Sequence, residues 1–113
     1  MSDPRSEVWT FGDGEGAGSA SSSVIDKLRL DLVGVAYPDS VVGTSITFNV
    51  STGPNGTMKA LYYDNAVFTL ALVADGFQSF PYHVFRGCRE IQIVSNDTEA
   101  DGTVILPVFR EPC

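Results

Sequence analysis

Short segments in which apolar and polar residues alternate are the clearest pattern in the chain. The alternation is strictest in three segments, which contain Ile46-Phe48-Val50, Ile91-Ile93 and Val104-Leu106-Val108. A period of two is typical of β-strands that have one face against a core and the other toward water or a partner. We therefore expect a core that includes Ile46, Phe48, Val50, Leu61, Ile91, Ile93, Val104 and Leu106.

Turn-forming residues separate the apolar segments and indicate the number of strands. Eight strands are expected, at 23–26, 29–37, 44–51, 57–63, 66–73, 77–82, 88–95 and 102–109. A connection as short as 52–56 requires antiparallel neighbours, and only 83–87 is compatible with a helical turn. The sequence therefore predicts an all-β fold, an antiparallel β-sandwich of jelly-roll type with about eight strands.

The N-terminal part of the chain differs from the rest in composition. Residues 12–23, GDGEGAGSASSS, are almost entirely Gly, Ala, Ser and acidic residues, which bury too little apolar surface to offset the entropy of ordering them. Before them lie Val8, Trp9 and Phe11, which either fold back on their own domain as a strand or anchor the chain to a neighbour. We predict a flexible arm at residues 1–22 with these three residues binding a partner, and a β-sandwich domain at residues 23–113.

Length and charge narrow the possible classes of function. A chain of 113 residues has room for one domain. Fourteen acidic against seven basic residues give a formal charge of −7, which repels nucleic acid. No apolar stretch approaches the roughly 18 residues of a membrane span, and residues 1–16 lack the pattern of a secretory signal. We expect no nucleic-acid or membrane partner, and two reduced thiols, Cys88 and Cys113.

Patterns that would indicate catalysis or metal binding are weak. His83 is the only histidine and has aromatic and aliphatic neighbours, which favours a packed or hydrogen-bonded side chain over a general base. Cys88 lacks the sequence context of cysteine enzymes. Most acidic residues occupy turns, where Asp bonds to nearby backbone. The segments GDGEG (12–16) and NDTEAD (96–101) offer oxygen ligands but do not match calcium-binding loops. We expect no catalytic, cofactor-binding or metal-binding residues and no cofactor.

Several segments, taken in their order along the chain, resemble a known group of proteins. They are SSSVID (21–26), LVGVAYP (32–38), TSITFNVSTGPNGTMKALYYD (44–64), VFRGCREIQIVS (84–95) and TVILPVF (103–109). In this order they are similar to small β-sandwich virion structural proteins that tailed bacteriophages encode among their structural genes. The resemblance covers residues 20–109, with a departure at 96–101, and does not extend to residues 8–18.

The resemblance implies a non-enzymatic role in the virion, after synthesis in the host cytoplasm. The expected function is that of a capsid decoration or cement protein, which binds the assembled head through its N-terminal arm and one sandwich face. Its expected partners are the major capsid protein or another virion protein, and further copies of the chain, with a trimer suited to the local threefold positions of a shell.

Two other functions remain open at this point. A tail or head–tail junction component would have the same composition. A carbohydrate-binding module is the third possibility, because Tyr37, Tyr62, Tyr63 and Tyr82 lie on or near predicted strands. Tyr62 and Tyr63 are adjacent in a strand, so we expect them to point to opposite faces.

Overall fold

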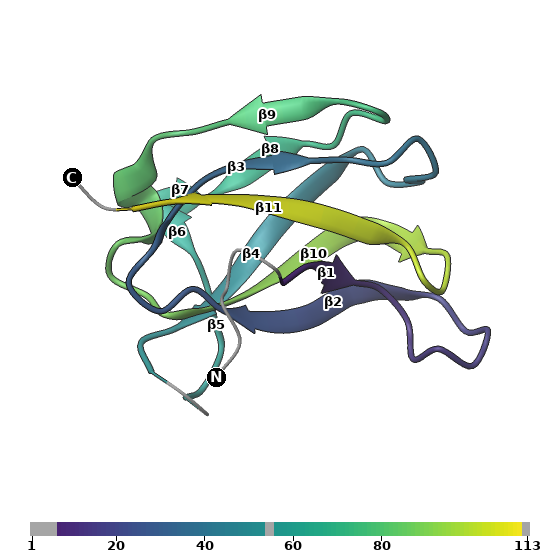
Figure 1. Ribbon diagram of the computed structural model, residues 1–113, viewed down its shortest axis with the longest axis horizontal. Coiled ribbons are helices and arrows are strands. Elements are labelled where there is room, and N and C mark those ends of the chain that lie inside the picture. Colours follow the sequence, from purple (N-terminus) through teal and green to yellow (C-terminus); the bar gives the residue numbers. More distant parts are fainter. Residues whose placement is uncertain (1–6, 54–55, 112–113) are drawn as a thin grey trace.

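The computed structural model describes residues 7–53 and 56–111 (Figure 1). The elements are β1 (Trp9–Thr10), β2 (Ser19–Asp26), β3 (Asp31–Ala36), β4 (Ser45–Ser51), β5 (Lys59–Ala60), β6 (Tyr62–Tyr63), β7 (Ala66–Val67), β8 (Thr69–Ala71), β9 (Phe77–Ser79), the 3-10 helix η2 (Tyr82–Phe85), β10 (Glu90–Glu99) and β11 (Val104–Arg110). Within these residues the chain has no α-helix. The predicted all-β fold is confirmed.

Two antiparallel sheets face each other across the core (Figure 1). The first sheet has the order β1-β11-β3-β9. The second has the order β2-β10-β4, and both β5 and β8 pair with the outer edge of β4. Trp9 of the first sheet donates a hydrogen bond from Nε1 to the carbonyl of Ile91 in the second, over 3.1 Å. The two layers are therefore in direct contact.

The inner faces of the two sheets supply a core rich in aromatic rings. Phe48 is fully buried, and its ring centroid lies 5.0 Å from that of Phe85 and 5.7 Å from that of Phe68. The rings of Trp9 and Phe80 each lie 6.5 Å from it in edge-to-face geometry. Among the predicted core residues, those buried fully are Ile46, Phe48, Ile91 and Ile93, and those buried in part are Val50 and Leu61.

The prediction for the last strand is wrong about which face is buried. Ile105 is fully buried, whereas Leu106 is 48% exposed and Val104 is only half-buried. The Cα partner of Ile105 is Trp9, which fixes Ile105 on the inner face. All side chains of residues 104–109 are apolar, so both faces of the strand look like a core face in the sequence.

The flexible arm predicted at residues 1–22 is corrected by β1 and β2. β1 pairs with β11 of the first sheet, and Phe11 forms a bridge to Ser22 in β2 of the second. The N-terminal segment therefore joins the two sheets along one side of the molecule (Figure 1). β2 begins at Ser19, so the predicted domain boundary at residue 23 falls inside a strand. Residues 1–6 lie outside the described part of the chain.

β5 and β8 are two halves of one edge strand. The amide of Leu61 donates to the carbonyl of Phe48 in β4 over 2.9 Å, and the preceding residue of β4, Thr47, pairs with Thr69. Residues 62–68 therefore leave the ladder, and six of them form the hairpin of β6 and β7. Its two-residue turn, Asp64-Asn65, has positive φ at both positions, as in a type I′ turn.

Candidate functional site

The residues predicted to bind a partner do not form a surface. Trp9 and Phe11 are 0% exposed, and Val8 is half-buried. Trp9 packs edge-on against Phe48, and the amide of Phe11 donates to the carbonyl of Thr103 over 2.9 Å. A side chain without exposed surface has no atoms to offer a partner. The structure thus corrects the anchor interpretation of Trp9 and Phe11 in favour of a strand folded back on its own domain.

Four loops meet at one end of the molecule, which we call the acidic end (right side of Figure 1). They are residues 11–18, 37–44, 72–76 and 95–103, the last of which includes the end of β10, and backbone hydrogen bonds join them in pairs. The acidic end carries Asp13, Glu15, Asp39, Asp75, Asp97, Glu99 and Asp101, and none of the described basic residues. The rest of the described chain has six acidic and six basic residues. The net charge of the described chain is therefore concentrated at this end.

A buried carboxylate, Glu99, holds two of these loops together. Its two oxygens accept hydrogen bonds from the amides of Val42 and Gly43, each over 2.8 Å, and from the hydroxyl of Ser95 over 2.7 Å. Glu99 is 0% exposed, and such hydrogen bonds are what make a buried carboxylate tolerable. A Cβ at Gly43 would lie 2.2 Å from the Ser95 hydroxyl oxygen, so the close approach requires glycine.

Asp101 organises the glycine-rich loop in a similar way. Its carboxylate oxygens accept hydrogen bonds from the amides of Gly14 and Gly16, over 2.8 and 2.7 Å. These two bonds, above all, hold the pKa of Asp101 below its ordinary value of 3.8. The segments GDGEG and NDTEAD thus bind each other through backbone amides. The described residues contain no group of three or more side chains suited to hold a metal ion.

We expect the glycine-rich loop to loosen when Asp101 loses its charge. Because the folded-state pKa is lowered, the stabilisation is present above the ordinary pKa of 3.8 and is lost as pH falls through the folded value. In Asp101→Asn, hydrogen exchange at Gly14 and Gly16 should be several-fold faster than in the wild type at pH 7. The difference should vanish in acid, and equal exchange rates at pH 7 would contradict the assignment.

The two residues considered for catalysis differ in burial, since His83 is exposed and Cys88 is half-buried. His83 Nε2 lies 3.1 Å from the hydroxyl oxygen of Tyr63. The thiol of Cys88 donates to the carbonyl of Phe85 over 3.1 Å. Burial raises the pKa of the Cys88 thiol from 9.0 to about 11, so at neutral pH it is protonated and a poor nucleophile. Cys113 lies outside the described residues.

The tyrosines do not form a common platform. Tyr37 is 5% exposed, and its hydroxyl oxygen lies 3.0 Å from Gln78 Oε1, inside the molecule. Tyr62 and Tyr63 are 64% and 40% exposed, but their different cross-strand partners place them on opposite faces of the hairpin. The side chain of Tyr82 lies outside the described part.

The central part of the outer face of the first sheet is mostly apolar and carries no charge. Leu106, Ala36 and Phe77 pair in one row across β11, β3 and β9, and Phe77 is 63% exposed. The neighbouring outward positions are Thr10, Val104, Val108, Gly34 and Ser79. None of these eight positions is charged, whereas the pair at the end of β11 and β3, Arg110 and Asp31, carries both signs of charge. Depletion of charge is typical of the core of a protein interface.

The outer face of the second sheet has a different character. Its central rows include Gln92, Asn49, Thr47 and Thr69, and the side-chain amide of Asn49 donates to Gln92 over 3.2 Å. This face is suited to water. The two outer faces of the molecule are thus chemically distinct.

No known protein family, curated protein or solved structure matches the chain. Among the described residues, no helix has both the length and the apolar composition needed to cross a membrane. The features on which a function can be built are therefore the chain's own: the uncharged outer face, the acidic end and the order of the strands.

Proposed function

We propose that the chain is a non-enzymatic structural protein of a tailed-phage virion, a decoration protein that binds the assembled head, and that its fold is an eight-stranded jelly roll. Counting β5 and β8 as one strand, with β6 and β7 as an insertion, gives eight strands in chain order. The two sheets then have the orders 1-8-3-6 and 2-7-4-5, and this order supports the proposed jelly roll. Jelly rolls are frequent in viral capsid proteins, which supports a role in the virion.

The uncharged outer face of the first sheet is the observation that carries the docking proposal. Leu106 and Phe77 lie on strands, where backbone pairing holds them in place before a partner arrives. A pre-organised apolar face loses little conformational entropy on binding. Docking through this face takes the place of docking through the N-terminal segment, whose aromatic side chains are in the core.

The acidic end fits the same orientation. It lies at the ends of the strands, so it stays in contact with water when the outer face of the first sheet is covered (Figure 1). Concentrated negative charge there discourages unspecific association. The rest of the described chain has equal numbers of acidic and basic residues, so it can approach a shell without long-range electrostatic repulsion.

A shell lattice also lowers the affinity that each contact has to provide. A decoration protein that touches the major capsid protein and copies of itself gains effective concentration from every additional contact. A homo-oligomer such as a trimer at the local threefold positions would use this effect. A rigid body with one apolar face is sufficient for such a role.

The docking proposal can be tested with empty heads that lack their decoration protein. Wild-type protein should bind in hundreds of copies, and Leu106→Glu should bind at least about 10-fold more weakly, because the new carboxylate would be buried unpaired in the contact. Val24→Glu is the matched control, since Val24 is 43% exposed on β2 of the other sheet. It should bind like the wild type.

Four outcomes would count against the proposal. Wild-type protein that does not bind heads contradicts the decoration role, and equal binding by Leu106→Glu contradicts the docking face. A copy number of a few per particle would assign the protein to the tail or the head–tail junction. A reproducible hit on a glycan array would favour the carbohydrate-binding alternative, for which the exposed Tyr62 is the best candidate contact.

A further inference from the structure

A pocket of about 330 Å³ opens at the end of the molecule opposite the acidic end. Val50, Leu61 and Val84 give it apolar walls, and Gly87 and Cys88 close one side. Lys59 is the one charged side chain in its described lining. The volume is at the lower limit of ligand pockets, which measure about 300–1,000 Å³. It suits a small molecule of about ten heavy atoms better than a cofactor.

The placement of Lys59 is unusual for a strand residue. It pairs with Val50, which in turn pairs with the fully buried Ile91, so the register places Lys59 on the inner face of the second sheet. The other residues of this row, Val50, Ile91 and Ile25, are apolar. No ion pair joins Lys59 to a carboxylate among the described residues. An ammonium group is therefore available where the apolar walls meet water.

The second lysine of the chain is buried near Cys88, one of the residues that line the pocket. Lys27 is 4% exposed, and its amide donates to the carbonyl of Arg89, the residue after Cys88. Its ammonium group donates to the carbonyl of Leu30 over 3.3 Å, and within the described chain it has no carboxylate partner. Lys27 is not among the residues that line the pocket, but its charge acts on the thiol of Cys88, which does line it.

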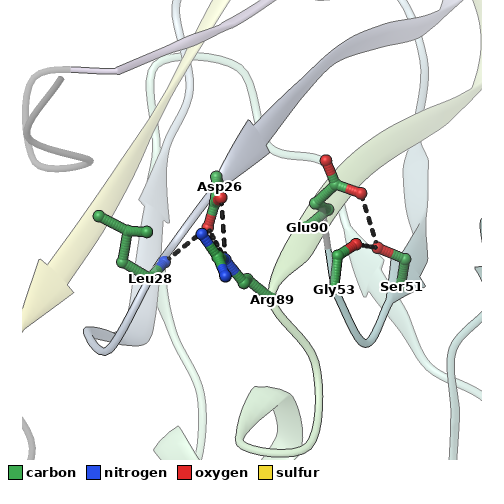
Figure 2. A network of polar contacts seen from close by, with 6 residues as sticks. All are labelled: Asp26, Leu28, Ser51, Gly53, Arg89 and Glu90. Atoms are coloured by element: carbon green, nitrogen blue, oxygen red, sulfur yellow. Dashed lines mark hydrogen bonds and ion pairs between the residues drawn. The ribbon is translucent and has the colours of Figure 1, made fainter. Parts of the chain in front are cut away.

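A network of polar contacts fixes the loops around the pocket (Figure 2). Asp26 accepts a hydrogen bond from Arg89 Nε over 3.0 Å and another from the amide of Leu28 over 2.9 Å. The hydroxyl oxygen of Ser51, a residue of the pocket, lies 2.8 Å from Glu90 Oε1. The loops around the pocket are consequently held in place. Glu90 brings a negative charge next to Ser51, and Lys59 is the one charged side chain in the described lining of the pocket.

We propose that this pocket binds a small carboxylate with an apolar body, of which a medium-chain fatty-acid anion is the simplest. The hydrocarbon lies against Val50, Leu61 and Val84, and the carboxylate is held at the mouth by the ammonium of Lys59. Lys27 contributes at longer range, through the low-dielectric interior. This site is distinct from the docking face, so its test does not depend on any virion.

The experiment measures binding of octanoate to the full-length protein by calorimetry. We expect saturable binding with a dissociation constant below about 1 mM, at least tenfold weaker binding of octanol, which lacks the charge, and no binding of octylammonium. Lys59→Gln should weaken octanoate binding about tenfold while octanol binding stays unchanged, because a single charge-assisted contact is removed.

A second variant tests the pocket itself. Gly87→Leu adds a side chain where a Cβ meets no atom within 4 Å, and the backbone there has no positive φ, so the fold should be retained. It should abolish octanoate binding, whereas Val73→Ala, at an exposed residue of the acidic end, should not. Binding that does not saturate at about 10 mM octanoate would overturn the proposal. Equal binding of octanoate by Lys59→Gln would also overturn it, because Lys59 would then only protect the edge strand from pairing.

Discussion

Replacing Trp9 by alanine should cost about 4–6 kcal/mol of unfolding free energy, most of what a domain of this size has available. Trp9 is fully buried, packs edge-on against Phe48 and donates a hydrogen bond to the carbonyl of Ile91. The substitution leaves a large cavity and removes the hydrogen bond that joins the two sheets. Urea unfolding followed by far-UV circular dichroism measures the loss.

Trp9→Phe is the matched control for that experiment. It keeps most of the apolar volume and removes the hydrogen bond, so it should cost about 1–3 kcal/mol, including the unpaired carbonyl. If Trp9 were an anchor on a flexible arm, neither substitution would change stability. Wild-type stability in Trp9→Ala would therefore contradict the core position of β1.

Phe48→Ala should be the second most damaging substitution, at about 3–5 kcal/mol. Phe48 is the shared neighbour of four other aromatic rings, those of Trp9, Phe68, Phe80 and Phe85. Since these rings come from β1, from η2 and from the residues that adjoin β8 and β9, the cavity cannot be closed by moving one element. The urea midpoint should fall while the dependence of free energy on urea stays unchanged.

Phe77→Ala provides the comparison for Phe48. Phe77 is 63% exposed on the edge strand β9, so its removal should cost less than about 1 kcal/mol. The same chemical change is thus made once in the core and once on the proposed docking face. Equal losses from the two substitutions would mean that the ring cluster around Phe48 is not the centre of the core.

The strands in the middle of the chain were predictable because their two faces differ. In β4 and β10, buried Ile46, Phe48, Ile91 and Ile93 alternate with half-buried or polar residues, so the period of two fixes both the strand and its phase. In β11 the residues of both faces are apolar, and only the pairing of Ile105 with Trp9 decides which face is buried. The sequence carries no local signal of that pairing.

The N-terminal segment was mispredicted because its stabilising contacts are remote in sequence. Composition alone indicates disorder for GDGEGAGSASSS, since it has almost no apolar side chains to bury. The structure orders it through the carboxylate of Asp101, which binds the amides of Gly14 and Gly16 more than eighty residues away. The available signal was the glycine at every second position from 12 to 18, together with the acidic turn at 96–101.

The candidate surfaces were even less accessible to sequence analysis. Lys59 and Cys88 are 29 residues apart, and only the fold brings them to one pocket. The division of one edge strand by residues 62–68 likewise depends on register with β4. Turn residues at Asp64-Asn65 indicated the hairpin, but they could not show that it interrupts a strand.

The fluorescence of Trp9 in the free protein tests most directly whether the N-terminal segment belongs to the core. Trp9 is the only tryptophan of the chain, so its emission reports this one position. We predict blue-shifted emission that is shielded from acrylamide and that shifts to the red in a single transition, coincident with the loss of far-UV circular dichroism. Red-shifted, readily quenched emission from the folded protein would contradict the account and return Trp9 to the role of an anchor.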